Sequence, residues 1–388
     1  MALYEGIALI QEKQAVVLDL GTDYTKFGFT GEAAPRCIIK SEYWCTTEKR
    51  FKRVHDYDTP EELYDNLVHM LHLLYFRHVL VNPKERKVVV VESLLTPTLF
   101  RETLAKVLFT HYEVSGVMWA DRPRLCALTL GAPVVLVVAL GALEAEVVAV
   151  VHGCPVLHAM QAQPLAARAL SAELARRLRL DNGPDTQLSD DVLEDIKVRL
   201  CFVASRERAL QWPAEEGDVT GDGGEAREAR YPLAAGALRV SGRTRARTAE
   251  VLFARDNELA SLPDIVLQCI MQCPIDTRRA LAENILVTGG TAAMPGLQAR
   301  LAHELRYLVT QPPYNSRLQV RTFKFHRAPA AASCAAWLGG ALCGAADGGG
   351  RALPREQYAR AVRLRDWDCL LHNTPRDHPH WTQLQPAL

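Results

Sequence analysis

The chain has 388 residues, 48% of them hydrophobic, and its 45 basic and 45 acidic side chains give a formal net charge of zero. A chain of this length and composition can bury a large core and divides into about two or three domains. The balanced charge excludes a global field that would draw the protein to nucleic acid or to an anionic membrane, so partners must be recognised by local surface.

Membrane insertion and a disulfide framework are not expected. The longest apolar run, Val134 to Leu140, is far shorter than the roughly 20 residues of a membrane-spanning helix. The stretch MALYEGIAL lacks a basic region followed by a long apolar core, as a signal peptide would have. The cysteines are scattered through apolar stretches, and Cys269 and Cys273 have helical spacing. Such usage is typical of reduced core residues, so we expect a soluble chain in the cytoplasm.

The front of the chain predicts a hairpin. Residues 15–29 (AVVLDLGTDYTKFGF) give an apolar strand, an acidic residue at its end, a glycine turn and a second strand. An aspartate at a strand end beside such a backbone turn is typical of phosphate-binding loops. Lys26 in the second strand either meets a phosphate as a point charge or pairs with a nearby carboxylate.

Strand and helix signals then alternate, which indicates an α/β fold. Thr59 is the expected N-cap of a helix that runs to Leu74, with Pro60 at its first position and Glu62 closing a capping box. The elements expected next are a strand at 87–91, a helix at 96–108, a strand at 113–119, a short helix at 125–128 and a fully buried strand at 134–138.

The chain repeats its opening pattern. Residues 136–142 (LVVALGA) match 16–22 (VVLDLGT) in the order of apolar, leucine, glycine and small residues. In both places a second strand follows the turn, at 26–29 and at 146–151. The repeat predicts two similar domains whose hairpin loops face one another across a cleft. A chance match between short apolar runs is the alternative.

The second half begins with helices expected at about 164–180 and 190–204 and an exposed polar loop at 215–230. The stretch GRTRART places Arg243, Arg245 and Arg247 at alternate positions. This pattern fits either a basic strand edge for an acidic partner or a solvated face.

The stretch 285–291 (ILVTGGT) predicts a strand that enters two glycines, before a helix that reaches Leu308. Glycine lets a backbone approach a phosphate or a flat ligand, and a helix N-terminus adds a favourable dipole. A tight turn that needs glycine for geometry alone explains the same residues, so both interpretations stay open.

Taken together, these stretches resemble actin and the actin-related proteins, members of the wider actin, hexokinase and heat-shock-70 ATPase fold, over nearly the whole chain. The similar segments are the first phosphate loop (Asp19 to Thr22, with Lys26), the second (Leu140-Gly141), the helix beside the adenine (Asp195-Ile196-Lys197), the adenosine loop (Thr288 to Gly296) and the late hinge helix (Ala336 to Gly340).

The resemblance implies two ribonuclease-H-like domains around a central cleft. The first domain is expected at 1–131 and includes a shortened subdomain at about 35–64, the second at 132–326, and 327–388 returns to the first domain and ends in a tail. The expected nucleotide contacts are Gly21, Thr22, Lys26, Lys197, Gly289, Gly290 and Thr291, and the expected magnesium position is Asp19.

This sequence departs from the family at positions that bind magnesium and phosphate. Magnesium needs well-aligned oxygen ligands, and the second acidic position is Ala139. The second loop continues as Ala142-Leu143-Glu144, with few of the glycines of a phosphate cradle, and Asp23 stands where the family usually has glycine.

The glutamine and histidine that position water in the family align with Arg122 and Glu146. Loss of one positioning group commonly costs orders of magnitude in rate, so we expect negligible ATP hydrolysis and no catalytic residue. The missing second carboxylate also argues against a bound magnesium. ATP or ADP held without hydrolysis and a cleft packed by side chains both remain open.

The segment from Pro35 to Tyr64 is much shorter than in conventional actins, where a flexible loop plugs the next subunit of the filament. A subunit that keeps one filament surface and rebuilds the other ends the filament, because heterologous contacts no longer continue. The C-terminal HNTPRDHPHWTQLQPAL is expected to be an exposed tail rather than a metal site.

The stretches LYFRHVLVNP, RETLAKVLF and QCPIDTRRALAEN most resemble the divergent branch of the family at the pointed end of dynactin. That resemblance implies a cytoplasmic, cytoskeletal subunit that contacts dynactin subunits four, five and six, actin-related protein 1 and actin, and indirectly dynein. The alternatives are an active or slow ATPase of the actin or sugar-kinase type and an actin-related subunit of a nuclear chromatin-remodelling complex.

Overall fold

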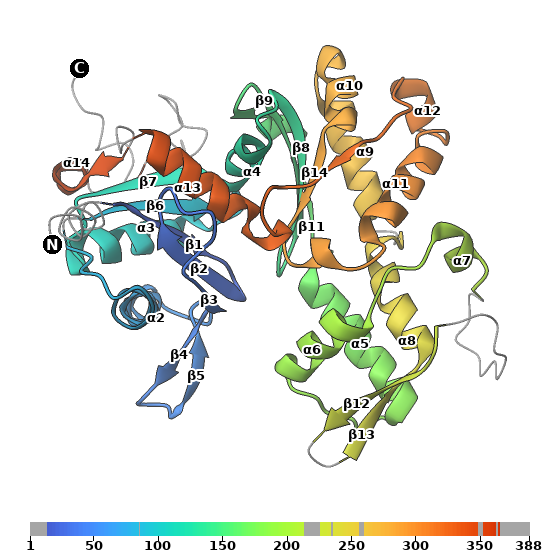
Figure 1. Ribbon diagram of the computed structural model, residues 1–388, viewed down its shortest axis with the longest axis horizontal. Coiled ribbons are helices and arrows are strands. Elements are labelled where there is room, and N and C mark those ends of the chain that lie inside the picture. The colour runs from blue at the N-terminus through green and yellow to red at the C-terminus, as the bar shows by residue number, and fades with distance from the viewer. Residues whose placement is uncertain are drawn as a thin grey trace, which may run out of the picture.

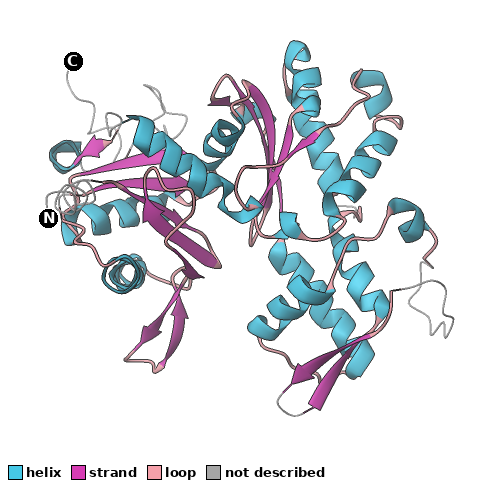
Figure 2. Cartoon of the chain, in the orientation of Figure 1, coloured by secondary structure: helices cyan, strands magenta, loops and turns pink. Residues whose placement is uncertain are grey.

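Two sheets, each covered by helices, form the body of the protein (Figure 1). The computed structural model describes residues 14–84, 86–212, 226–233, 236–255, 260–347, 352–361 and 364. Figure 2 shows the strands gathered into these two sheets and two small hairpins, with helices around them.

The first sheet has the order β16-β7-β6-β1-β2-β3. β1 pairs antiparallel with β2 and parallel with β6, which in turn is parallel to β7. Its strands are β1 (Val16–Leu20), β2 (Tyr24–Phe29), β3 (Cys37–Lys40), β6 (Lys87–Glu92), β7 (Gly116–Asp121) and β16 (Leu353–Pro354).

Both faces of the first sheet are buried, because successive side chains of a strand point to opposite faces. Val16 and Leu18 belong to one core, beneath α2 and α3, whereas Val17 belongs to another that includes Trp337 of α13. The helices of this half are α2 (Pro60–Leu73) with π-helix η1 (Leu74–Val79), α3 (Thr98–Lys106) with π-helix η2 (Val107–His111), α4 (Arg122–Leu130), α13 (Ala335–Asp347) and α14 (Arg355–Ala361).

The second sheet has the order β10-β9-β8-β14-β15, with β11 on β9. β8 pairs antiparallel with β9 and parallel with β14, so the two sheets share the pairing plan that the sequence repeat predicts. Its strands are β8 (Val134–Leu140), β9 (Ala145–Val151), β10 (Cys154–Pro155), β11 (Gln161–Gln163), β14 (Ile285–Thr288) and β15 (Phe325–His326).

Helices and a two-stranded hairpin complete the second half, on the right of Figure 1. The α-helices are α5 (Ala167–Asn182), α6 (Asp190–Leu200), α7 (Arg206–Leu210), α8 (Gly242–Arg247), α9 (Leu262–Gln272), α10 (Ile275–Glu283), α11 (Leu297–Leu308) and α12 (Tyr314–Arg317). The 3-10 turns are η3 (Leu157–Ala159), η4 (Thr248–Leu252), η5 (Thr291–Ala293) and η6 (Ala332–Cys334), and the hairpin is β12 (Ala229–Leu233) with β13 (Gly236–Val240).

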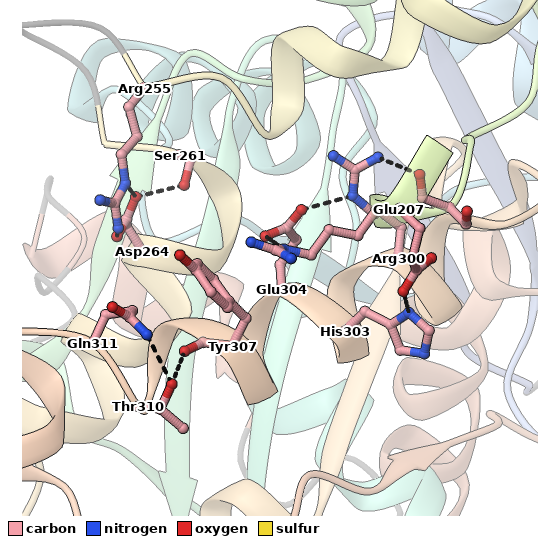
Figure 3. Close-up of polar contacts among 12 residues, drawn as sticks. Glu207, Arg255, Ser261, Asp264, Arg300, His303, Glu304, Tyr307, Thr310 and Gln311 are labelled. Carbon is pink, nitrogen blue, oxygen red and sulfur yellow. Dashed lines mark hydrogen bonds and ion pairs between the residues drawn. The ribbon is translucent and has the colours of Figure 1, made fainter. Parts of the chain in front are cut away.

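Two buried ionic side chains, Asp264 and Arg300, have charged partners in this half, and Figure 3 shows both residues. Asp264 of α9 accepts hydrogen bonds from Ser261 Oγ at 2.5 Å and from Arg255 Nε at 2.6 Å. Arg300 of α11 forms a bidentate salt bridge with Glu250, with two hydrogen bonds of 3.0 Å each. A buried charge is tolerated only when it is paired and hydrogen-bonded in this way.

The shortened front segment forms a separate hairpin, β4 (Glu42–Cys45) with β5 (Arg50–Arg53). Its inner face is fixed to α2, where Tyr43 donates a hydrogen bond to Asn66 Oδ1 at 2.7 Å. Its outer face carries Trp44 and Phe51, whose ring centroids lie 5.2 Å apart and which remain 53% and 61% exposed.

Several sequence predictions need correction. The alternating arginines of GRTRART lie in helix α8 rather than at a strand edge. Ser241 caps this helix by accepting a hydrogen bond from Thr244 N, and Arg247 is buried with its guanidinium 4.8 Å from the Trp212 ring centroid, so the solvated-face alternative fails for Arg247 too. The loop predicted at 215–230 is wrong at its end, because 229 and 230 belong to β12, and residues 215–225 lie outside the described part.

Element boundaries also differ. The helix expected to start at 96 begins at Thr98, the strand expected from 113 begins at Gly116, and the helix expected to reach 204 ends at Leu200, where Cys201 becomes extended. The predicted capping box is confirmed: Thr59 Oγ1 accepts a hydrogen bond from Glu62 N at 3.2 Å, and the Glu62 carboxylate accepts backbone hydrogen bonds from Thr59 and from Asp58.

Neither a membrane-spanning helix nor a disulfide occurs in the described residues. None of the described helices is long and apolar enough to cross a bilayer. Cys269 and Cys273 are free and buried, and the described residues hold no cluster suited to a metal ion. The histidines of the C-terminal tail lie outside the described part of the chain.

Candidate functional site

A cleft of about 1040 Å³ lies where the two sheets face one another. The loop after β1 and the loop after β8 line it from opposite sides, together with one face of α6 and the segment that follows β14. All eight residues predicted from the sequence line this one cleft: Asp19, Gly21, Thr22, Lys26, Lys197, Gly289, Gly290 and Thr291. Arg122, Ala139 and Glu146 line it as well.

Asp19 lies at the floor of the cleft and is held by two cations. Its Oδ2 is 2.9 Å from Lys26 Nζ, and its Oδ1 is 3.6 Å from a terminal nitrogen of Arg122. Burial alone would raise the pKa of the Asp19 carboxyl, but the charges of Lys26 and Arg122 lower it below its ordinary value. Lys26 therefore takes the ion-pair role that the sequence left open.

Glu146 of β9 meets the same arginine from the opposite sheet. Its Oε1 is 4.0 Å from Arg122 and accepts a hydrogen bond from Ser93 Oγ at 2.6 Å. Burial would lower the pKa of Arg122, but the nearby carboxylates of Asp19 and Glu146 raise it. A guanidinium thus lies between two carboxylates that come from opposite sheets.

Several backbone groups of the second loop are hydrogen-bonded, one within the loop and two to helix α5. Gly141 N donates to Glu144 O at 3.1 Å, and the carbonyls of Gly141 and Ala142 accept from the first amides of α5, Ala167 N and Arg168 N. Gly141 N is therefore already paired, and so are the first two amides of α5, which leaves these N–H groups unable to donate to a phosphate.

The first loop is also fixed by internal contacts. Ser41 Oγ donates to Gly21 O at 2.6 Å, and a Cβ on Gly21 would lie 2.7 Å from Tyr24 O. Asp23 lies 3.6 Å from Arg168 across the cleft. The negative charge of Asp23 is thus partly compensated by a cation from the other side of the cleft.

Two further ion pairs cross the mouth of the cleft. Lys40 of β3 pairs with Asp191, and Arg53 of β5 pairs with Asp190, both at the start of α6. All four side chains are more than 40% exposed. Pairs this exposed are each worth about 0–1 kcal/mol, so they contribute little to the attachment of one half to the other.

The opposite side of the cleft keeps the residues that resemble an adenosine site. Lys197 of α6 is buried, donates to Ser171 Oγ at 3.2 Å and lies 2.5 Å from Glu194. Met294 and Pro295 border the same space. Val203 N donates to Pro295 O at 2.8 Å, which fixes this loop to the chain just beyond α6.

The two adjacent glycines of this loop have different reasons for being glycine. Gly289 has a φ of +97°, and a Cβ there would lie 2.0 Å from Leu140 O, so its geometry is required by the fold. Gly290 has an ordinary φ of −64°, and a Cβ there would meet no atom within 4 Å. Packing in the protein does not explain Gly290, whereas a ligand lying close to its backbone would.

These features fit an adenine nucleotide better than they fit magnesium. The cleft is large enough for a nucleotide and is lined by Lys197, Gly290 and Thr291, and a Cβ on Gly290 would meet no atom within 4 Å. For the metal, Asp19 is already paired with Lys26 and Arg122, and Ala139 supplies no second carboxylate. A hard divalent cation needs several oxygen ligands, so the residues present do not form its site.

The chain matches a known family over most of its length. Residues 54–348 match the family model described as Actin, which is well over half of the chain. The chain therefore belongs to the actin family and has the actin-like ATPase fold, with its cleft between two α/β halves.

Some residues of the site, among them Ser93 and Arg168, were not predicted from the sequence. Ser93 directly follows β6, which runs parallel to β1, so it lies at the same strand-end edge as Asp19. That position was a usable signal, because ligand sites collect at the carboxyl ends of parallel strands. Arg168 carries no such signal, since only the folded chain brings it to Asp23.

Proposed function

We propose that this chain is a non-catalytic structural subunit of dynactin, of the kind called actin-related protein 10 or actin-related protein 11, which caps the pointed end of the short actin-like filament. It supports dynein-driven transport along microtubules in the cytoplasm. Its proposed partners are dynactin subunits four, five and six, actin-related protein 1 and actin.

One observation carries the non-catalytic part. Arg122 lies 3.6 Å from Asp19 and 4.0 Å from Glu146, at the place where an actin-type ATPase positions water. Arg122 is a permanent cation that only donates hydrogen bonds, so it cannot take a proton from water or hold water through an acceptor. Positioning groups of this kind contribute orders of magnitude in rate.

The filament-capping part is supported by the rebuilt front segment and by the resembling stretches of sequence. The short β4–β5 hairpin carries an exposed aromatic pair, Trp44 and Phe51, on a face that α2 fixes from behind. Rigid exposed aromatic residues are typical anchors of protein interfaces. A subunit with such a rebuilt face cannot accept a further copy of the filament contact and so ends the filament.

The cleft of the proposed subunit holds ATP or ADP without turnover. The support is the open space at Gly290 together with Lys197 and Thr291. In this role the nucleotide is a structural filler that joins the two halves of the protein.

Single-turnover hydrolysis tests the catalytic assignment. Purified chain mixed with a limiting amount of ATP is expected to release no phosphate above the buffer rate, with conventional actin measured in parallel. Phosphate release at the rate of actin, lost in Asp19→Ala, would instead identify an active ATPase.

Affinity purification from cells tests the partners. Tagged chain is expected to recover dynactin subunits and actin-related protein 1, and recovery of chromatin-remodelling helicases without dynactin would overturn the proposal. The double variant Trp44→Ser, Phe51→Ser is expected to lose subunits four, five and six while retaining actin-related protein 1. Leu180→Ser, at a residue 63% exposed on α5, is the matched control.

A further inference from the structure

We propose that Arg122 takes the place of a divalent cation in the cleft: its guanidinium links Asp19 of the first sheet to Glu146 of the second, so that the cleft needs no divalent metal. The chain thus supplies from its own sequence the positive charge that would otherwise come from a bound ion. Ligand binding in such a cleft is independent of magnesium.

The position of Arg122 is set by rigid elements. It is the first residue of α4, directly after Asp121, whose side chain accepts a hydrogen bond from Arg124 N at 2.8 Å and so caps the helix. α4 packs against α13 and against strands of both sheets. The backbone of Arg122 is therefore fixed at the junction of the two halves, and its side chain reaches into the cleft between them.

The charges around Arg122 balance without a metal. Lys26 and Arg122 carry two positive charges, and Asp19 and Glu146 carry two negative ones. The side chains of all four are at most 22% exposed. A divalent cation in this group would face two fixed cations at short range in a poorly screened environment, which is strongly unfavourable.

The same geometry gives a way to create a metal site. Oδ1 of Asp19 and Oε2 of Glu146 are buried and have no hydrogen bond within the described part of the chain. Both carboxylates lie within 4.0 Å of the one guanidinium. Removal of that positive charge leaves two carboxylates with unshared lone pairs, which hard cations prefer.

The first test uses Mn²⁺ as the probe, read by the loss of its free electron paramagnetic resonance signal. The wild-type chain is expected to bind no Mn²⁺ at concentrations up to about 1 mM, whereas Arg122→Gln gains one site with a Kd below about 1 mM. Arg124→Gln is the matched control, because Arg124 lies on the same helix and pairs with Asp121 outside the cleft.

Adding Glu146→Gln to Arg122→Gln is expected to abolish the gained site. A stoichiometric Mn²⁺ site in the wild-type chain, or no gain in a folded Arg122→Gln variant, would overturn the proposal. Circular dichroism and the melting temperature show whether each variant is folded. If Arg122→Gln does not fold, Arg122→Met is measured in its place under the same criteria.

The second test rests on the nucleotide role proposed above and measures affinity for a fluorescent ADP analogue. The Kd is expected to change by less than about threefold between Mg²⁺ and EDTA. A loss of tenfold or more in EDTA would contradict metal independence. An absence of binding in both buffers would contradict the proposed nucleotide role. The Mn²⁺ test uses no nucleotide and would then decide the role of Arg122.

Discussion

The indole Nε1 of Trp337 donates a hydrogen bond to the carbonyl oxygen of Val17 at 3.2 Å, and so joins helix α13 to strand β1 across 320 residues of sequence. Trp337 is fully buried. Trp337→Phe leaves that buried carbonyl without its indole donor and also removes part of the ring. We expect it to lower the free energy of unfolding by about 2–4 kcal/mol in urea denaturation. Trp44→Phe, at an exposed tryptophan, should change it by less than about 0.5 kcal/mol. Equal effects of the two substitutions would contradict the anchoring role of Trp337.

The two glycines after β14 should respond differently to alanine. Gly289→Ala places a Cβ 2.0 Å from Leu140 O at a φ of +97°, and we expect it to destabilise the fold by more than about 3 kcal/mol. Gly290→Ala meets no atom within 4 Å, so stability should stay within about 0.5 kcal/mol of wild type. The same Gly290→Ala should weaken nucleotide binding, as measured by fluorescence titration. Unchanged nucleotide affinity would mean that no ligand approaches this backbone.

Asp264 should make the stability of the second half sensitive to acid. Burial raises the pKa of its carboxyl, but hydrogen bonds from Arg255 and Ser261 bring it below its ordinary value. A carboxyl whose pKa is lower in the folded state stabilises the fold above its unfolded pKa of about 3.9, and this contribution is lost as the pH falls through the folded pKa.

Asp264→Asn is therefore expected to cost about 2–4 kcal/mol at pH 7 and clearly less at pH 3, as measured by urea unfolding at each pH. Exposed Asp185→Asn is the control and should show little change at either pH. A constant cost of Asp264→Asn across this range would show that charge is not its source.

His55 should make the stability of the protein depend on pH in a higher range than Asp264 does. It lines the cleft, its ring stacks on Phe100 at a centroid distance of 4.8 Å, and burial lowers the pKa of its imidazole to about 4. Between about pH 6.5 and 4 the unfolded chain binds a proton on this side chain that the folded chain does not. Stability should therefore fall as the pH is lowered through this range.

Replacement of His55 by Phe keeps an aromatic ring against Phe100 and removes the titrating group. Between pH 7 and pH 4.5 the free energy of unfolding should fall for both proteins, and the fall should be about 1–3 kcal/mol smaller for the variant, as measured by chemical denaturation. His158→Gln, at an exposed histidine, is the control. Identical pH profiles of wild type and His55→Phe would rule out His55 as the source.

The sequence was most informative where one physical signal dominated. The apolar runs that became β1 and β8, and the repeated leucine-glycine turns after them, predicted two similar halves and the two loops that line the cleft. The Thr59-Pro60 signal predicted the start of α2, and one of the two interpretations of the glycines after β14, a tight turn that needs glycine for its geometry, holds for Gly289.

Elsewhere two signals competed, or the relevant contact was distant in sequence. The alternating arginines of GRTRART predicted a strand edge or a solvated face. The Ser241 cap and the burial of Arg247 against Trp212 instead favour a helix. The π-helical continuation of α2 at Leu74–Val79 depends on tertiary packing and has no clear local signature. Arg122 was identified as a departure from its family, but its contacts with Asp19 and Glu146 become visible only when the two sheets face one another.

The ion pairs that cross the cleft differ in how far their side chains are buried. They should therefore weaken at different salt concentrations. Lys40–Asp191 and Arg53–Asp190 lie at the lip, where the side chains are largely exposed, while Arg122 and its carboxylates lie near α4, where both sheets meet. Salt screens exposed charges far more than buried ones. Rising ionic strength is therefore expected to weaken the two exposed ion pairs before it weakens the contacts of Arg122.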